Sequence, residues 1–300
     1  AMPERWSRWL LERMLPAYFK PDGSTNEGLI YWEYTTNCAA EALYVLARQR
    51  GCTPRELAPE AFGETMRYVL HMRSLSSKTL RFLPIGDCRN EDFQFMGPPL
   101  LFFANFYGDS QALSVWRRWC SGGNAPGSPV FGSPHRTGQM PTVALLQLLL
   151  AKEDDAPPLS LEMRRRFPST DRIFWRTGAD YGDWLLFFEG GPQTFTHAHF
   201  DKGHFILEAY GESLVTDPGM ILYSYPGSAA LKDSVCHNVA TVGGKNQSYR
   251  DAAQAVVIRE LSHGDCYELL RSDLSGSYKE LRMYERTLLF VRSGYVLIMD

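Results

Sequence analysis

The sequence predicts an α+β chain of two domains, an incomplete α/α toroid over residues 1–155 followed by an antiparallel β-sandwich over residues 156–300. In the first part, apolar residues recur at three- and four-residue spacing, which is typical of helices. In the second part, short runs rich in β-branched and aromatic residues alternate with turn residues, which is typical of strands. Residues 152–158, a charged run closed by two prolines, mark the boundary between the two patterns.

Helical spacing occurs first over residues 6–15 and again over residues 39–47. Pro54 opens a further helix, because Thr53 before it is a suitable N-cap residue. The remaining helical segments are predicted up to residue 71 and at residues 98–106, 110–120 and 142–151. Successive helices joined by polar, glycine-rich loops favour an α/α solenoid or toroid.

Consecutive strand-like runs fill the second part, and Gly211 and Glu212 form a predicted hairpin turn between two of them. Such a series indicates an antiparallel β-sandwich. Because helical spacing starts near residue 1 and the last run stops in mid-strand, we expect further sequence on both sides. The predicted strands are residues 172–176, 184–188, 204–210, 213–216, 238–242, 255–261, 266–271, 284–291 and 295–299.

The composition excludes several classes of protein. A formal net charge of −3 gives no global basic field, so nucleic acid is not an expected partner. No run approaches the roughly 20 apolar residues of a membrane span, and the start of the chain lacks the pattern of a signal peptide. Six widely spaced cysteines without a CxxC motif favour buried thiols in a reducing compartment over a disulfide framework.

Three of the seven histidines, His197, His199 and His204, fall within eight residues. Side chains two apart in a strand face the same side, so His197 and His199 are expected to project together. Such imidazoles suit a transition metal or acid–base chemistry near neutral pH. Asp217 and His237 follow at suitable places for further polar groups of one site. A chance cluster, or a histidine that caps a turn, is the structural alternative.

Three segments together resemble the heparinase II/III-like family of polysaccharide lyases. Residues 22–34 (DGSTNEGLIYWEY) are similar to the family's DG…EG..Y..Y segment, and residues 197–205 (HAHFDKGHF) to its H.H.D.G.F segment. Residues 217–219 (DPG), followed by HN at 237–238 and GGKNQ at 243–247, are similar to its third segment. The resemblance spans nearly the whole chain and implies an α/α toroid joined to an antiparallel β-sandwich.

The resemblance implies a lyase that cleaves a uronic-acid-containing polysaccharide or oligosaccharide by β-elimination. A base removes the C5 proton, and the C4–O bond breaks to leave an unsaturated uronate. Because that proton is weakly acidic, the site must neutralise the carboxylate, supply a base and protonate the leaving oxygen. The family's carboxylate-neutralising Asn or His lies upstream of the catalytic tyrosine, which would place it before residue 1; the alternative is that this protein lacks that group.

Carried over by position, Tyr31 resembles the catalytic tyrosine of the toroid, acting as general acid and also as a candidate base. Tyr34 is the second candidate for this role; in the alternative, Tyr31 is a packing residue on a helix and Tyr34 or Trp32 faces the cleft instead. His197 resembles the catalytic histidine, and a further metal ligand is its alternative role.

The resemblance also implies that His199, Asp217 and His237 bind zinc, with water or another protein oxygen completing the coordination. The ion would be mainly structural, pinning strands beside the site and orienting His197. The alternative is a hydrogen-bonded cluster without metal.

Seven further residues are predicted to contact the substrate, and for each of them packing or a solvated surface position is the alternative. Arg89 offers a bidentate fork for a carboxylate. Tyr223 and Tyr225 lie in the loop after Asp217, and Glu27 is suited to orient Tyr31 or cap its helix. The seven residues are Glu27, Trp32, Arg89, Tyr223, Tyr225, Asn238 and Gln247.

The expected partner is an anionic polysaccharide or oligosaccharide, and heparin-like chains, other glycosaminoglycans and alginate all satisfy this chemistry. A homodimer and a bacterial cytoplasmic or periplasmic location stay open. Two other functions are weighed. One is a non-catalytic carbohydrate-binding protein. The other is a metallo-β-lactamase-like zinc hydrolase, whose HxHxDH signature would place a histidine where Lys202 stands.

Overall fold

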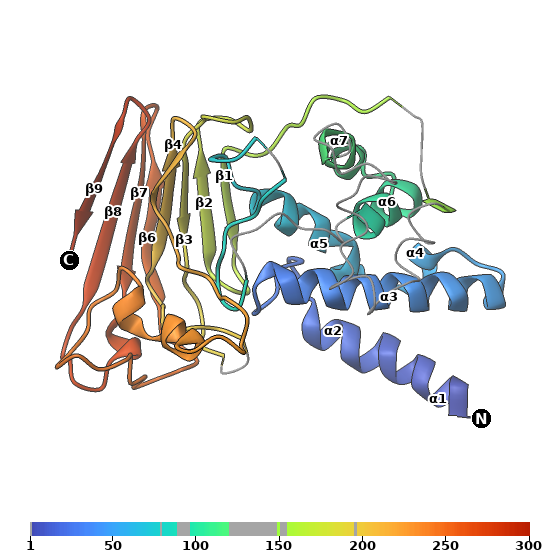
Figure 1. Cartoon of the computed structure of the whole chain (residues 1–300), viewed down its shortest axis with the longest axis horizontal. Helices are drawn as coiled ribbons and strands as arrows, with labels where there is room; N and C mark the ends of the chain where they lie inside the picture. The colour runs from blue at the N-terminus through green and yellow to red at the C-terminus, as the bar shows by residue number, and fades with distance from the viewer. Residues whose placement is uncertain (1, 79, 89–96, 120–148, 151–154, 195–196) are drawn as a thin grey trace.

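The computed structural model describes residues 2–78, 80–88, 97–119, 149–150, 155–194 and 197–300. The α-helices lie at one end of the molecule and two β-sheets at the other, where the short 3-10 helices Ser228–Lys232, Ser234–Cys236 and Ser275–Ser277 also lie (Figure 1). The order of helices first and strands second agrees with the sequence prediction. Most of the predicted helix at residues 142–151 lies outside the described residues.

The helical part is built on α3, the longest described helix, which runs along the whole of this part (Figure 1). Gly51 follows α3 in the left-handed conformation and ends it. Thr53 caps the next helix in a capping box with Glu56, as the sequence predicts. The helices are α1 (Met2–Trp9), a π-helical turn (Leu10–Met14), α2 (Leu15–Tyr18), α3 (Leu29–Arg50), α4 (Pro54–Leu57), α5 (Glu60–His71), α6 (Gly97–Phe106) and α7 (Ser110–Trp119). None of the described helices is long and apolar enough to cross a bilayer.

Two antiparallel sheets form the β part, and in each one every strand pairs with the next along the chain. Their facing sides share a core that includes Trp175, Leu186, Leu270, Leu288 and Phe290. The first sheet contains β1 (Arg164–Phe167), β2 (Arg172–Arg176), β3 (Leu185–Phe188), β4 (Phe205–Ala209) and β5 (Glu212–Val215). The second contains β6 (Val257–His263), β7 (Tyr267–Asp273), β8 (Glu285–Val291) and β9 (Tyr295–Met299).

Two strand predictions differ from the structure. Residues 238–242 form turns and an isolated bridge, because the Asn238 side chain bonds both the N–H and the C=O of Phe205 in place of a strand ladder. Strand β1 was not predicted, since three successive arginines in Arg164–Phe167 hide its pattern.

The other face of the first sheet packs against the helical part, so the hydrophobic core continues across the junction. The ring of Phe167 packs edge-on against two rings of the helical part. Its centroid lies 5.1 Å from that of Tyr68 and 5.8 Å from that of His71. The buried Arg172 guanidinium donates to the Thr25 carbonyl oxygen at 2.6 Å and also to the Tyr68 hydroxyl. These contacts fix the helical part against the sheet.

Glu208 on β4 adds a buried carboxylate to this junction. It accepts hydrogen bonds from the Ser74 hydroxyl at 2.7 Å and the Leu75 N–H at 2.6 Å. The backbone and hydroxyl of Ser76 donate to it as well. One sheet residue thereby satisfies four donors of the segment that follows α5.

Glu208→Ala is expected to lower the free energy of unfolding by about 3 kcal/mol, because it leaves several buried donors without an acceptor. Chemical denaturation of the variant and the wild type measures the change. Glu212→Ala is the matched control, since Glu212 is exposed on β5 and a change within about 0.5 kcal/mol is expected. Similar losses in both variants would contradict a special role of Glu208 at the junction.

Candidate active site at the junction of the helical and β parts

Tyr31 and His197 meet where the first turn of α3 faces the β part. Their rings stack with centroids 3.6 Å apart and planes inclined by 12°. Gly28 is the N-cap residue of α3, and a Cβ there would lie 2.3 Å from the Ile85 carbonyl oxygen. Only glycine therefore lets the segment before Asp87 pass so close to the start of the helix.

The hydroxyl groups of Tyr31 and Tyr223 lie 2.6 Å apart. Tyr223 donates its hydroxyl hydrogen to Oδ2 of Asp87 at 2.6 Å, and its oxygen lies 3.4 Å from Nδ1 of His197. Tyr31 can therefore donate to Tyr223 while Tyr223 donates to Asp87, which forms a chain of hydrogen bonds from α3 to the carboxylate.

Asp87 is the centre of the site, with a side chain that is 0% exposed. Its Oδ2 accepts from Nδ1 of His197 at 2.8 Å and from Nζ of Lys232 at 2.8 Å. Its Oδ1 lies 3.1 Å from Nε2 of His199. Burial alone would raise the pKa of this carboxyl, but the four hydrogen bonds that it accepts lower it below the ordinary value. We refer to Asp87, His197, His199, Tyr223 and Lys232 as the Asp87 cluster.

The position of Asp87 follows from the turn that carries it. Gly86 has φ +58°, and a Cβ on it would lie 2.7 Å from the carbonyl oxygen of His197. The Asp87 N–H donates to that same oxygen at 3.0 Å. On the other side of the turn, the Met220 N–H donates to the Cys88 carbonyl at 2.8 Å. Backbone bonds to two β-part segments therefore hold the carboxylate in place.

Because an ionised carboxylate only accepts hydrogen bonds, Asp87 requires Nδ1 of His197 to carry a hydrogen. The other nitrogen, Nε2, is then the basic atom, and it lies 3.9 Å from the carboxylate of Glu27. The His197 side chain is 34% exposed, so its ring is accessible from solvent. The ring can therefore accept a proton at Nε2 while Asp87 holds its orientation.

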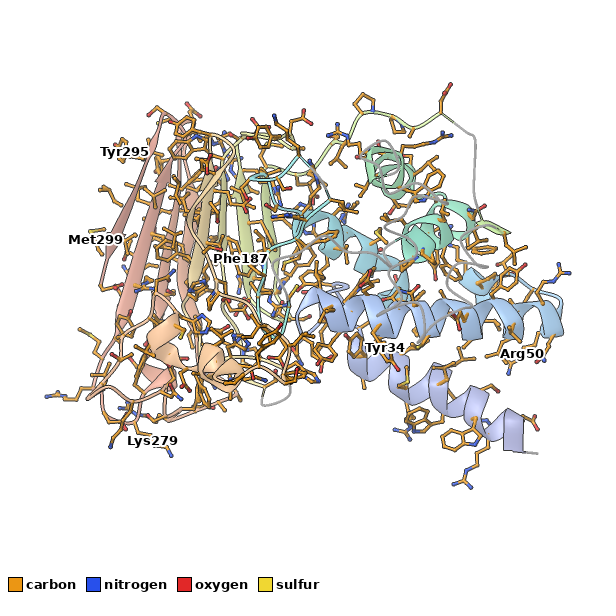
Figure 2. All side chains as sticks on the ribbon, viewed as in Figure 1. Tyr34, Arg50, Phe187, Lys279, Tyr295 and Met299 are labelled. Carbon is orange, nitrogen blue, oxygen red and sulfur yellow. The ribbon has the colours of Figure 1, made fainter. Side chains whose placement is uncertain are left out.

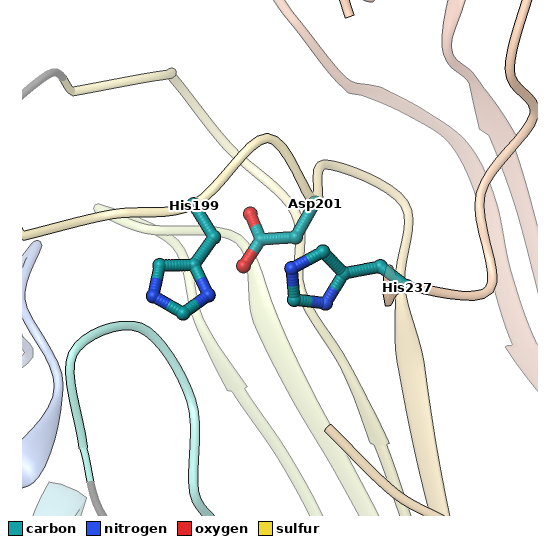
Figure 3. Close-up of side chains that lie close together, drawn as sticks. All are labelled: His199, Asp201 and His237. Carbon is teal, nitrogen blue, oxygen red and sulfur yellow. The ribbon is translucent and has the colours of Figure 1, made fainter. Parts of the chain in front are cut away.

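A second group of buried side chains lies next to the Asp87 cluster. Figure 3 shows His199, Asp201 and His237 directed toward one another. His237 also belongs to a set with His204 and Asp217, and in each set the candidate ligand atoms lie within 4.8 Å of one another. We refer to these five residues as the histidine–aspartate cluster.

Several polar atoms of the histidine–aspartate cluster lack a hydrogen-bond partner within the described part of the chain. Such buried atoms are costly unless something pairs with them, and imidazole with carboxylate is a suitable donor set for a transition metal. The residues present therefore fit a metal ion. The atoms are His199 Nδ1, Asp201 Oδ1, His204 Nε2 and His237 Nε2, and also Asp217 Oδ2 and His237 Nδ1, which face each other as an ion pair without hydrogen-bond geometry.

Burial disfavours the charged forms of Asp201 and His204, whereas at His237 the effect of burial is outweighed by Asp217, which raises the pKa of this imidazole. Burial raises the pKa of Asp201 to about 6, although neighbouring Lys202 opposes the shift. Burial lowers the pKa of His204 to about 4, so this imidazole is neutral at pH 7 and able to act as a ligand. Nε2 of His199 is hydrogen-bonded to Asp87, so Nδ1 of this ring faces the histidine–aspartate cluster. A carboxylate behind a metal-binding histidine is a common arrangement.

The structure brings the three predicted zinc ligands into this one cluster. The rings of His199 and His237 are 5.3 Å apart, and Oδ2 of Asp217 lies 3.2 Å from Nδ1 of His237. Asp201 and His204 were not among the predicted ligands. Both lie in the segment that carries His197 and His199, so their proximity in sequence was the available signal.

Some predicted substrate residues have structural positions instead. Trp32 is fully buried and donates its Nε1 hydrogen to Thr65 at 2.7 Å, so it packs in the helical core. Gln247 is also buried, with its carboxamide bonded to both the N–H and the C=O of Lys202. The Asn238 side chain bonds the Phe205 backbone. Trp32 and Gln247 are therefore buried, and the half-buried Asn238 side chain is engaged by the backbone of Phe205.

The other predicted residues divide between the site and the surface. Tyr223 belongs to the Asp87 cluster, and Glu27 lies beside His197. Tyr34 and Tyr225 are each 57% exposed, and Tyr34 lies on α3 (Figure 2). Arg89 lies outside the described residues.

Asp87 and Lys232 were not predicted from the sequence. Asp87 lies in a turn and Lys232 at the end of the short 3-10 helix Ser228–Lys232, neither belongs to the histidine segment, and only the fold brings them to His197. The Gly86-Asp87 pair was the available signal, since a glycine in a turn often allows a close backbone approach.

Known proteins similar to this chain come from the same heparinase II/III-like group that the three sequence segments indicated. Residues 161–300 match a family model described as heparinase II/III-like, C-terminal. The structure is similar to that of the heparan sulfate lyase HepC from Pedobacter heparinus, with a TM-score of 0.69 and 16% sequence identity over 98% of this chain. It is also similar to a structure of heparinase III, with a TM-score of 0.69 and 15% identity over 98% of this chain. No curated protein gives a significant match.

At this identity, the structural similarity shows the shared fold. The chain spans about two fifths of the solved proteins, 41% of HepC and 43% of the heparinase III chain. The predicted fold class, a helical part followed by an antiparallel β-sandwich, is confirmed. The resemblance that the three sequence segments indicated is confirmed as well.

Asp87→Asn is expected to lower the free energy of unfolding by about 3 kcal/mol, since an amide turns N–H groups toward donors that need an acceptor. Denaturation in urea measures the change. Asp180→Asn is the control, because Asp180 is 71% exposed in its pair with Arg118 and such pairs contribute below about 1 kcal/mol. If both variants lose the same small amount, Asp87 is not the centre of the site.

Proposed function

Since residues 161–300 match the heparinase II/III-like C-terminal family model, we propose that the protein is a lyase that cleaves a uronic-acid-containing polysaccharide by β-elimination. The observation that supports this most directly is the pairing of Tyr31 with His197. One residue comes from the helical part and one from the β part, and their rings stack at 3.6 Å. A phenol and an imidazole side by side supply an acid and a base for one reaction.

In the proposed reaction, Nε2 of His197 takes the proton from C5 of the uronate. The electron pair of that C–H bond forms the C4–C5 double bond, and the C4–O glycosidic bond breaks. The Tyr31 hydroxyl gives its proton to the leaving oxygen. On substrates of the opposite stereochemistry at C5, Tyr31 is the candidate for the base as well.

The neighbouring groups support these two roles. Asp87 accepts the Nδ1 hydrogen of His197 and stabilises the imidazolium that forms when Nε2 takes a proton. Tyr223 lies 2.6 Å from the Tyr31 hydroxyl oxygen, and turning its one hydroxyl hydrogen from Asp87 to this oxygen would stabilise the tyrosinate left after proton donation. The hydrogen bond from Tyr223 to Asp87 keeps this hydroxyl directed into the site.

The substrate is proposed as a class. Heparan sulfate is the first candidate, because the similar HepC structure is named a heparan sulfate lyase. Alginate, hyaluronan and chondroitin offer the same uronate chemistry and belong in the same test panel. A binding-only protein would need no acid–base pair, and it is the second outcome that the panel detects.

The metallo-β-lactamase alternative fits less well. Its HxHxD segment needs His197 as a metal ligand, whereas Nδ1 of His197 bonds Asp87 and its ring stacks on Tyr31. The helical part followed by two sheets also differs from the αββα layers of that fold.

We also propose that the histidine–aspartate cluster holds zinc, with ligands from among His199, Asp201, His204, Asp217 and His237. Bound there, the ion would supply positive charge that pins these segments together beside the site. His199 then joins the ion to Asp87, and Asp87 joins it to His197, so the ion would help to orient the base.

The natural-length protein is expected to release unsaturated uronate, followed by its ultraviolet absorbance, from one member of a panel of heparan sulfate, alginate, hyaluronan and chondroitin. His197→Ala and Tyr31→Phe are each expected to lower kcat by about 10³-fold, since each removes a proton-transfer group. Tyr34→Phe tests the other tyrosine of α3 and is expected to keep turnover.

Binding of a polymer without any rise in absorbance would support the binding-only function instead. Loss of turnover in Tyr34→Phe with retention in Tyr31→Phe would exchange the roles of the two tyrosines.

His237→Ala is expected to lose zinc during dialysis, whereas the wild type retains it, because His237 belongs to both candidate ligand sets. Metal analysis by mass spectrometry measures this, and chelation should lower the melting temperature of the wild type alone. His263→Ala is the control, as His263 is exposed on β6. A wild type free of zinc after growth and dialysis with zinc would reject the site.

A further inference from the structure

The Asp87 cluster contains an ammonium group that the proposed acid–base chemistry does not use. Nζ of Lys232 lies 2.8 Å from Oδ2 of Asp87, on the same oxygen that His197 and Tyr223 contact. Its charge also lies over the ring of Tyr223, 5.8 Å from the centroid. Lys232 therefore shares an acceptor oxygen with the proposed base, His197, and with Tyr223, the partner of the Tyr31 hydroxyl.

Lys232 differs from Asp87 in its access to solvent. The Lys232 side chain is 27% exposed, whereas that of Asp87 is 0% exposed. An ammonium group has three N–H donors, and the contact with Asp87 needs one of them. The exposed side of Nζ can therefore donate to a bound anion while the contact with Asp87 holds the group in place.

The backbone around Lys232 is anchored beside the site. Its carbonyl oxygen accepts from the Phe200 N–H at 2.9 Å, and the Ser234 hydroxyl donates to the Phe200 carbonyl at 2.7 Å. The Asn246 side chain holds the same segment through the Ser234 N–H at 2.9 Å. Because Phe200 directly follows His199, these bonds tie the position of Lys232 to that of the histidine segment.

We propose that Lys232 binds the carboxylate of the uronate substrate and makes that carboxylate a requirement for tight binding; this inference rests on the proposed lyase function. Removal of the C5 proton places negative charge on the adjacent carboxylate, so a fixed cation beside it lowers the barrier. A lysine acts as a point charge and does not need the planar geometry of an arginine pair. Among the described residues, Lys232 brings a cation to the Asp87 cluster.

The test compares the binding of two ligands that differ only in the carboxylate. The probes are hexasaccharides of heparan sulfate and of alginate, each paired with a derivative whose uronate carboxylates are reduced to alcohols. Calorimetry on the natural-length protein with His197→Ala, which blocks turnover, gives the ratio of the two Kd values. Lys232→Met is expected to lower this carboxylate preference by about 10- to 100-fold. Lys232→Arg is expected to keep most of it.

A second variant separates direct contact from a general change of charge. Asp87→Asn with Lys232→Met removes one charge of each sign, so the net charge of the site is unchanged. The carboxylate preference is expected to stay low in this double variant. Lys279→Met is the matched control, because Lys279 is exposed at the end of the sandwich far from the helical part, and it is expected to keep the preference (Figure 2).

The inference is overturned if Lys232→Met keeps the carboxylate preference, if the double variant restores it, or if neither hexasaccharide binds. Melting temperatures of the variants identify a loss that arises from unfolding, and in that case Lys232→Arg decides the outcome. The lyase function is tested separately by turnover of the wild type. A preference that depends on Lys232 in a protein without turnover would support the contact and reject the lyase.

Discussion

The site depends on one physical constraint, which is that the buried carboxylate of Asp87 must be compensated by donors. A charge that is 0% exposed is costly without partners, and it receives hydrogen bonds from His197, His199, Tyr223 and Lys232. These donors come from three different segments of the β part, while Asp87 itself belongs to the helical part. The site can therefore form only when the two parts are docked in this arrangement.

The junction between the two parts uses other buried charges in the same way. Glu189 accepts from Arg172 at 2.8 Å and from Lys202 at 2.6 Å, and Arg172 reaches the Thr25 carbonyl of the helical part. The two cations lower the pKa of Glu189 to about 2 against the effect of burial, so it stays ionised. Lys202 directly follows Asp201, and this network therefore extends from the helical part to the histidine–aspartate cluster. Such charged contacts fix one docking geometry, which apolar packing alone would define less sharply.

The sequence was sufficient to bring Tyr31 and His197 together and to group His199, Asp217 and His237, because each stands in a short segment with a recognisable spacing. It was not sufficient for Asp87 or Lys232, since a charged residue outside any motif resembles a solvated surface residue until the fold brings its partners together. Asn238 and Gln247 were expected to contact substrate, yet their amides complete the backbone hydrogen bonds of Phe205 and Lys202. Some polar residues beside a motif therefore face the site, whereas others hold the backbone in place. The hydrogen bonds of each side chain to the backbone distinguish the two kinds, and the spacing in the sequence does not.

The shared acceptor has a consequence for how the proposed chemistry and the proposed metal site depend on each other. His199 donates to Oδ1 of Asp87, and His197 donates to Oδ2 of the same carboxylate. A change in the orientation of His199 would therefore rotate the carboxylate that holds His197, Tyr223 and Lys232. A metal that fixes His199 from its other nitrogen would set the geometry of the base, the phenol chain and the exposed ammonium together. In this arrangement a structural ion affects activity without contacting the substrate, because one rigid carboxylate transmits its position.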